Sequence, residues 1–349
     1  MAVPLLPLQS TPAKRPISRA VIFKWSCAFL MIWALASWVR FSGQFSAPTI
    51  PLHETKGVDP PALDGFAVET SSSAEKSESE DAMPVAAPAT TRKHTDRVAV
   101  IIEDRPLGNL VPVLSHFHSV LGPEWPVILY TSQQTAAVLL RSASLSRAVA
   151  ASEVEIRYLP ANTAFDSHAS VSAFLTSPFL WTDLAPYLKI LLFQADSILC
   201  SAAPGRVDDF MDYDLVGAPI DARLGSGFNG GLSLRNRELV LRVLERWDFA
   251  ADSGDADADA PREWRFEDQW LFARMRELGE DTELAGELGL RVQLPDQATA
   301  ERFAVETIWV EGRRPLGFHQ PHRWQSEHMD EIMEYCPEVG MIAGSSFFG

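Results

Sequence analysis

The sequence predicts an α/β fold: a mixed, mostly parallel sheet sandwiched by helices, forming a single lumenal domain after an N-terminal transmembrane helix. Three observations predict it. Residues 20–39, AVIFKWSCAFLMIWALASWV, are an apolar run long enough to span a bilayer. Residues 40–96 are rich in proline, serine, threonine and acidic residues, which is typical of a disordered stalk. From residue 97 onward, apolar runs alternate with segments of helical periodicity, which favours a parallel sheet covered on both faces.

Basic residues precede the apolar run and indicate its orientation. Lys14, Arg15 and Arg19 lie before it without any acidic residue, and Lys24 lies near its start. The positive-inside rule therefore leaves the N-terminus in the cytosol. The alternative, a cleaved signal peptide, would have a shorter apolar region and a small-residue cleavage site. We expect a cytosolic tail at 1–19, a signal anchor at 20–39, a stalk at 40–96 and the globular domain at 97–349.

Charge and cysteine content limit the function classes. The net charge of −16 excludes a nucleic-acid partner, because phosphate binding needs a basic face. The 3 cysteines are too few for a disulfide scaffold. Cys27 lies in the predicted span, so Cys200 and Cys336 either form one bridge or stay reduced.

The strands and helices of the globular domain follow from its apolar patterns. Strands are expected at 98–103, 126–131, 154–159, 189–194 and 213–219, and the glycine-rich stretch 225–236 predicts a turn leading into a further strand. Helical spacing occurs at 110–121, from about 135, through 179–188, at 237–247 and from Glu267. The acidic insert 250–261 lacks the glycine and terminal glutamate of a calcium loop, which favours a solvated loop.

Polar residues follow two of these strands, at the sheet edge where parallel α/β folds bind ligands. Glu103, Asp104 and Arg105 follow the first strand; helix capping is the alternative role for the two acids. Asp196 interrupts the apolar run ILLFQADSIL. Since a buried ionised aspartate is costly to desolvate, Asp196 either faces water at the strand end or holds a cation.

Four short stretches occur in one order: QADS, FNGGLSLRN, EDQW and GFHQPHRW. This order resembles that of GT-A-fold glycosyltransferases, and its spacing is similar to that of glycogenin-like nucleotide-sugar transferases. In detail the chain resembles a fungal family of membrane-anchored, glycosyltransferase-like proteins, over residues 97–337. The resemblance implies a GT-A-like domain in a single-pass type II protein of the Golgi or endoplasmic reticulum membrane.

The resemblance also implies an activity and a set of site residues. A sugar would move from a nucleotide-sugar donor to a glycan, protein or lipid acceptor, with Mn²⁺ or Mg²⁺ stabilising the leaving diphosphate. Asp196 and His319 would hold the metal, and Asp268, with Glu267 beside it, would be the catalytic carboxylate. The expected substrate-binding residues are Glu103, Asp104, Arg105, Gln194, Asn229, Gly230, Gly231 and Gln269.

One departure from the family pattern keeps a second function open. Gln194 stands where the family motif has its first acidic residue, so the predicted metal site has one carboxylate fewer. The alternative is a catalytically silent carbohydrate-binding or scaffold protein on the same fold. A metal-dependent hydrolase fits least, since its clustered Asp and His residues are absent from the sequence. Simpler roles are a surface histidine for His319 and a helix N-terminal acid for Asp268, while Trp270 and Phe272 are expected in the core.

Overall fold

The computed structural model describes residues 96–161, 163–254, 262–281, 283, 286, 289 and 291–342. All of them belong to one compact unit, Ala86–Gly349. The predicted cytosolic tail, the signal anchor and the stalk as far as residue 95 lie outside the described residues. Within the described ranges, no helix is long and apolar enough to cross a membrane.

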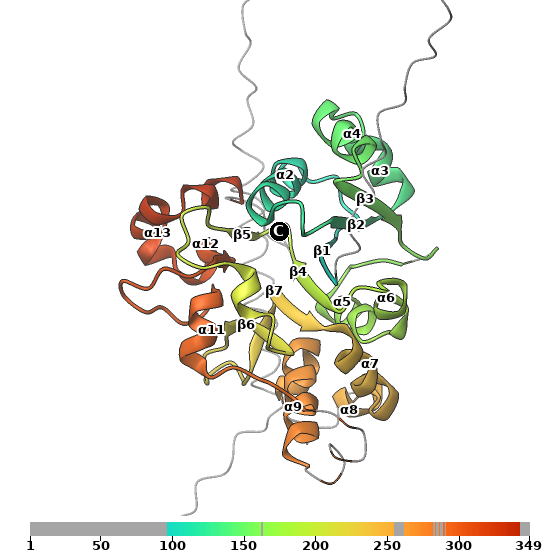
Figure 1. The fold of residues 1–349 in the computed structure, drawn as a ribbon, viewed down its shortest axis with the longest axis vertical. Helices are drawn as coiled ribbons and strands as arrows, with labels where there is room; N and C mark the ends of the chain where they lie inside the picture. Colours follow the sequence, from blue (N-terminus) through green and yellow to red (C-terminus); the bar gives the residue numbers. More distant parts are fainter. Residues whose placement is uncertain are drawn as a thin grey trace, which may run out of the picture. The chain divides into compact units, whose positions relative to one another are not determined.

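A six-stranded sheet in the order β3-β2-β1-β4-β7-β6 forms the centre of the unit (Figure 1). The strands β1 (Arg97–Ile102), β2 (Val127–Thr131), β3 (Val154–Tyr158) and β4 (Lys189–Phe193) run parallel. Strand β7 (Phe228–Asn236) pairs antiparallel with β4 and with β6 (Leu215–Pro219). The predicted α/β class and the mixed, mostly parallel sheet are therefore confirmed.

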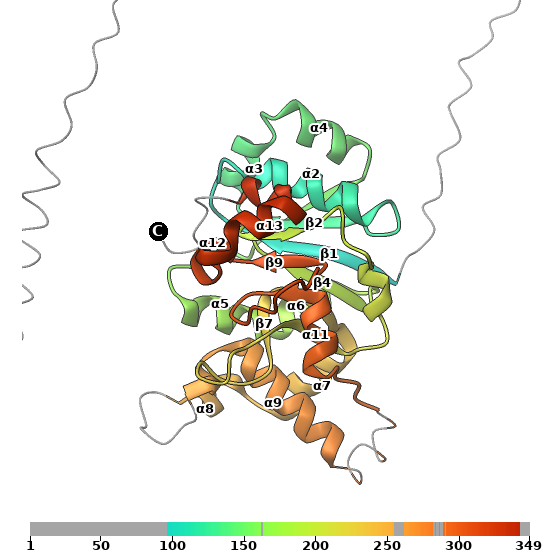
Figure 2. The ribbon, with the colours of Figure 1, turned by 90° about the vertical axis from the view of Figure 1, so that its left-hand side faces the viewer.

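The central strands are apolar on both faces because helices cover both. Residues Val98 to Ile101 of β1 are fully buried, as are Ile190 and Leu191 of β4. In Figure 2 the strands cross the middle of the unit, with α2 (Leu110–Leu121), α3 (Gln133–Leu139), α4 (Ala143–Ala150) and α13 (Met329–Tyr335) on one side. Helices α7 (Arg237–Arg246), α8 (Phe249–Ser253) and α9 (Glu267–Glu280) lie on the other side.

Shorter elements complete the described unit. They are α5 (His168–Leu175), α6 (Pro178–Asp183), α11 (Gln297–Phe303), α12 (Pro321–Trp324), and the 3₁₀ turns η1 (Val207–Phe210), η2 (Arg262–Arg265), η3 (Ser326–His328) and η4 (Pro337–Met341). Helix α11 packs against β6, and α9 packs against β7. Trp270 of α9 is fully buried and Phe272 packs against the core, so the expected core roles of both residues are confirmed.

A second, three-stranded sheet brings distant parts of the chain together. Its order is β5-β9-β8, with β5 (Ser197–Leu199), β9 (Gly317–His319) and β8 (Ala304–Val305). Ser197 pairs with His319 in the antiparallel β5–β9 ladder. Because β5 begins directly after Asp196, this pairing places the two predicted metal ligands side by side.

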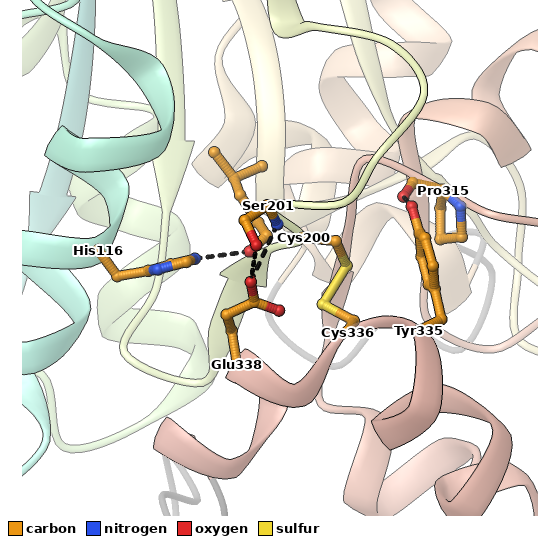
Figure 3. The surroundings of a disulfide bond; sticks show 8 residues. His116, Cys200, Ser201, Pro315, Tyr335, Cys336 and Glu338 are labelled. Atoms are coloured by element: carbon orange, nitrogen blue, oxygen red, sulfur yellow. Dashed lines mark hydrogen bonds between the residues drawn. A yellow bond between two sulfur atoms is a disulfide. The ribbon is translucent and has the colours of Figure 1, made fainter.

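A disulfide bond joins Cys200, just after β5, to Cys336, just after α13 (Figure 3). The Cα atoms are 5.0 Å apart, within the usual range for a bridge. Of the two states that the sequence allowed, the structure has the bridged one. Nearby, the Glu338 carboxylate accepts a hydrogen bond from the Ser201 backbone N–H. These contacts fasten the C-terminal helices to the end of β5.

Candidate functional site

A cavity of about 340 Å³ lies where β4 ends and β7 begins. The residues on its wall come from elements far apart in the sequence, which the two sheets bring together. They are His168, Val171, Ser172, Leu175, Gln194, Ile220, Leu224, Asn229, Gly230, Gly231, Phe266, Glu267, Asp268, Gln269, Glu306, Thr307, His319, Gln320, Arg323 and Trp324. Eight of the predicted site residues are among them: Gln194, Asn229, Gly230, Gly231, Glu267, Asp268, Gln269 and His319.

The three predicted residues after β1 lie elsewhere and contact one another. Glu103 is buried, and its carboxylate accepts hydrogen bonds from the Arg105 backbone N–H and from Nε and Nη2 of Arg105 at 2.8–3.0 Å. Neither acid caps the next helix, because Asn109 occupies that position. Hydrogen bonds to Glu103 raise the pKa of Arg105, and the Asp196 charge contributes to this shift. The loop therefore lies within electrostatic range of Asp196.

Asp196 is 3% exposed, so it does not face water. Its Oδ2 accepts a hydrogen bond from Gln320 Nε2 at 2.8 Å. Its Oδ1 has no hydrogen-bond partner in the described part of the chain and lies 3.5 Å from His319 Nε2. Burial would raise the pKa of Asp196, but the nearby His319 charge and the hydrogen bond from Gln320 outweigh burial and hold the pKa below its usual range.

His319 is 4% exposed, so the surface-histidine interpretation is wrong. Its Nδ1 lies 2.9 Å from Glu306 Oε1, and its Nε2 lies 3.1 Å from Gln194 Oε1. Burial would lower the pKa of His319, but the charges of Asp196 and Glu306 outweigh it and raise the pKa to about 10. The imidazole thus lies between two carboxylates.

The Asp196–His319 pair fits a divalent cation in donor type and position. A buried carboxylate oxygen without a partner faces an imidazole nitrogen, and once the imidazole has released its proton this N,O donor set suits Mn²⁺ or Mg²⁺. In the described ranges, however, no three His, Cys, Asp or Glu side chains converge closely enough to hold a metal ion by themselves. The remaining ligands would have to come from a bound substrate or water.

Glu306, which the sequence analysis did not single out, contacts His319 through Nδ1, on the opposite side of the ring from Asp196. It is buried just after β8, and its Oε1 also accepts a hydrogen bond from Asn229 Nδ2 at 3.1 Å. Asn229 Oδ1 in turn accepts from the Gly231 backbone N–H at 2.7 Å. These contacts fix the ring of His319 relative to the start of β7.

Asp268 lies on a different part of the cavity wall, in the first turn of α9. Its Oδ2 accepts a hydrogen bond from the Gly230 backbone N–H at 2.8 Å, and its Oδ1 accepts from the Gln269 backbone N–H at 2.7 Å. Burial and the charge of Glu267 raise the pKa of Asp268 to about 7, although these bonds and Arg235 oppose the shift. Asp268 can therefore gain or lose a proton near neutral pH.

Glu267, beside it, is paired with a cation. Arg235 is fully buried, and its Nη2 donates to Glu267 Oε1 at 3.0 Å. Its Nε donates to Ser233 Oγ at 3.0 Å, while Nη1 has no partner among the described residues. The structure therefore gives the two adjacent carboxylates different surroundings: a salt bridge for Glu267 and backbone N–H groups for Asp268.

Gly230 and Gly231 are needed for close packing around the site. A Cβ on Gly231 would lie 2.3 Å from His319 Nε2, and one on Gly230 would lie 2.6 Å from Arg235 Nη2. Both glycines lie within β7 rather than in a turn before it. Gln269 Oε1 accepts from the Ser226 backbone N–H at 3.0 Å, which fastens the loop before β7.

Several wall residues were not predicted from the sequence: His168, Phe266, Glu306, Gln320, Arg323 and Trp324. One signal could have found Glu306. It directly follows the apolar residues Ala304 and Val305, as Asp196 follows an apolar strand. Gln320, Arg323 and Trp324 lie in the stretch GFHQPHRW, and Phe266 directly precedes EDQW, but nothing local distinguishes them as wall residues, because their place on the wall depends on tertiary packing.

Comparison with known proteins gives one family match and distant structural likenesses. A family model described as "Protein of unknown function (DUF5672)" matches residues 153–319. No curated protein matches the chain. The apo-form glycosyltransferase GlyE of Streptococcus pneumoniae TIGR4 aligns with a TM-score of 0.35 and 13% identity, over 70% of this chain and 64% of that chain. The mannosyltransferase PcManGT from Pyrobaculum calidifontis, solved with GDP-Man and Mn²⁺, aligns with a TM-score of 0.34 and 13% identity, over 72% of this chain and 70% of that chain.

The chain thus spans less than two thirds of the length of the first of these structures. The family match begins at β3 and ends with β9. Asp196, Asp268 and His319 all lie inside the segment that matches this family model.

Proposed function

We propose that this protein transfers a sugar from a nucleotide-sugar donor to a carbohydrate or glycoconjugate acceptor. One observation carries the proposal: His319, whose Nε2 lies 3.5 Å from Asp196 Oδ1, lines the same cavity as a carboxylate, Asp268, whose pKa is about 7. Sugar transfer with inversion needs two features: a place where the leaving diphosphate is stabilised, and a group that takes the proton of the acceptor hydroxyl.

Asp196 and His319 would hold Mn²⁺ or Mg²⁺ through Oδ1 and Nε2. When bound, the metal supplies positive charge that stabilises the departing nucleoside diphosphate. Gln194, whose Oε1 now contacts His319 Nε2, contributes a neutral oxygen where the family pattern has a carboxylate. Because the described residues offer only Asp196 and His319 as charged or basic ligands at this point, oxygens of the nucleoside diphosphate would have to supply further ligands, and metal and nucleotide would then bind together.

Asp268 would accept the proton of the acceptor hydroxyl in a reaction that inverts the sugar. The backbone N–H groups of Gly230 and Gln269 fix its carboxylate in place. In a reaction that retains configuration, Asp268 and Gln269 would instead orient the donor sugar. Glu267 and Arg235 form a buried ion pair that holds the start of α9 against β7.

The protein is proposed to be a type II membrane protein of the Golgi or endoplasmic reticulum. The apolar run 20–39 and the basic residues before it support this orientation. The Cys200–Cys336 bridge is compatible with an oxidising lumen. Protease added to sealed microsomes is expected to spare the domain from Arg97 onward, and its digestion without detergent would contradict the assignment.

One observation favours the second candidate, a silent carbohydrate-binding or scaffold protein. Gln194 not only replaces an acid but also occupies His319 Nε2, the nitrogen that would bind metal. The full-length protein should be incubated with a panel of nucleotide sugars with and without Mn²⁺. Metal-dependent release of a nucleoside diphosphate is expected; binding of sugars without any nucleotide binding or turnover would favour the silent protein.

A further inference from the structure

Phe266 occupies the N-cap position of α9, where its side chain cannot cap the helix. Ser, Thr, Asp and Asn are preferred at this position, and a good cap stabilises a helix by about 1 kcal/mol. Seven other helices have such a cap, from Ser132, Ser142, Ser167, Ser177, Asn236, Asp248 and Asp296, whereas α2, α12 and α13 lack a side-chain cap as α9 does. A residue that breaks a local rule without local gain is a candidate for a functional role.

The exposure of Phe266 points in the same direction. Its side chain lies on the cavity wall and remains 37% exposed, whereas the next two residues, Glu267 and Asp268, are buried. Leu224, another wall residue, is 43% exposed. An aromatic ring thus forms part of the accessible wall, two residues before the carboxylate proposed to exchange protons.

The surroundings of this ring are both apolar and polar. The His168 ring meets Phe266 edge-on, with centroids 6.0 Å apart and an interplanar angle of 79°. Arg323 and Gln320 lie on the same cavity wall and are joined by a hydrogen bond from Arg323 Nη1 to Gln320 Oε1. An acyl chain would leave such polar groups unmatched, whereas a pyranose has an apolar C–H face and hydroxyl groups around its edge.

We infer that Phe266 is the platform on which a pyranose ring of the acceptor stacks, with its hydroxyl edge toward the Asp268 side of the cavity. The inference rests on the proposed function, because only a sugar transferase has an acceptor. It names a pyranose as the class of acceptor that the site binds. Stacking on the exposed ring would hold the sugar in the open part of the cavity, apart from the Asp196–His319 pair. Phe266 would then determine acceptor binding without contributing to metal or nucleotide binding.

Saturation-transfer NMR on the full-length protein in detergent micelles tests this directly. The probes are the methyl pyranosides of glucose, galactose and mannose, each alone. At least one should receive saturation from the protein, strongest at the C–H protons of one ring face. Phe266→Ser should weaken its binding about 5- to 10-fold, which is the size of an aromatic stacking contribution. Phe266→Trp, which keeps an aromatic face, should retain binding.

Phe179→Ser is the matched control. Phe179 is 39% exposed, close to the value for Phe266, but it lies in α6 and off the cavity wall. The control should leave pyranoside binding unchanged. Because the new serine at position 266 can cap α9, the melting temperature of Phe266→Ser should be no lower than that of Phe179→Ser.

Titration with UDP and GDP in the presence of Mn²⁺ separates this inference from the proposed function. Unchanged nucleotide affinity with lost pyranoside binding in Phe266→Ser supports the platform. If pyranoside binding depends on Phe266 but the wild type binds no nucleotide, the result supports the stacking platform and overturns the proposed transferase. Wild-type binding of no pyranoside, or equal binding by Phe266→Ser, overturns the platform whatever the nucleotide result.

Discussion

Two pairs of carboxylates lie at or beside the cavity: Asp196 with Glu306, and Glu267 with Asp268. Each pair has one cationic partner, but the partner is placed differently. In the first, His319 lies between Asp196 and Glu306 and contacts both. In the second, Arg235 donates a hydrogen bond to the Glu267 carboxylate, whereas the Asp268 carboxylate accepts hydrogen bonds from backbone N–H groups. A shared cation keeps the pKa of Asp196 below its usual range, whereas Asp268 rises to about 7.

This difference shows how similar residues acquire different chemistry. A cation in contact favours the ionised carboxylate, while burial beside a like charge favours the neutral form. Asp196 therefore stays ionised, which suits a metal ligand. Asp268 can exchange a proton near neutral pH, which suits acid–base catalysis.

The largest effect is expected for Asp268→Asn. The amide keeps an oxygen for the Gly230 N–H but cannot exchange a proton, so turnover should fall about 10²- to 10⁴-fold. Release of nucleoside diphosphate from a sugar donor measures it. Asp296→Asn, at an exposed N-cap that asparagine also serves, is the control. If Glu267→Gln abolished turnover and Asp268→Asn did not, the roles of the two acids would be exchanged.

Asp196→Asn should have the next largest effect, on binding. It removes the charge that faces His319 Nε2, so Mn²⁺-dependent affinity for a nucleoside diphosphate should fall about 30- to 1,000-fold, equivalent to ~2–4 kcal/mol. Calorimetric titration with and without Mn²⁺ measures it. Asp268→Asn should leave this affinity unchanged. If the affinity for the nucleoside diphosphate changed neither with Mn²⁺ nor with the substitution, the proposed metal site would be wrong.

Glu306→Gln tests whether the Asp196–His319 pair needs the carboxylate on the other side of the imidazole ring. Glu306 contacts His319 Nδ1, as expected for a residue that positions a metal ligand. The glutamine can still accept this hydrogen bond but does not carry the negative charge. Removing such a partner typically costs about 10- to 100-fold in metal affinity. Mn²⁺ titration in the presence of UDP or GDP measures the change. An unchanged affinity would mean that Glu306 only holds Asn229.

Sequence patterns predicted most of the sheet because burial on both faces demands continuous apolar runs. The strands at 98–103, 126–131, 154–159 and 189–194 all appear as β1 to β4, within a residue or two at each end. Eight cavity-wall residues lie in the four stretches QADS, FNGG, EDQW and GFH, which were singled out through the family resemblance that their order carries. Local composition was sufficient for the strands but not for these residues.

The remaining site residues depend on long-range contacts that composition does not encode. Arg235 looks like an ordinary charge near the end of a strand, yet it is fully buried because β7 turns that face toward α9. Glu306 reaches His319 only because β8 and β9 pair. Glu103 and Arg105 were expected to bind substrate, and the structure adds a mutual ion pair that the sequence did not reveal.

The smallest expected effect is the pH dependence of stability that Asp268 causes. Its pKa is about 7 in the folded protein, above the ordinary value of 3.8, so the folded state binds a proton that the unfolded state has lost. This stabilisation is fully present below the unfolded pKa and is lost as pH rises through the folded pKa. Integrating this loss from about pH 6 to about pH 8 gives about 1.4 kcal/mol of unfolding free energy.

Urea unfolding of the wild type and of Asp268→Asn at both pH values measures this contribution. The comparison must be between the two proteins, because burial and Glu103 also raise the pKa of Asp104 and add a slope of the same sign. The substituted protein should lose less stability than the wild type over this range, by the amount given above. Equal losses would mean that Asp268 is ionised throughout, like Asp196, and that the two carboxylate pairs do not differ in protonation.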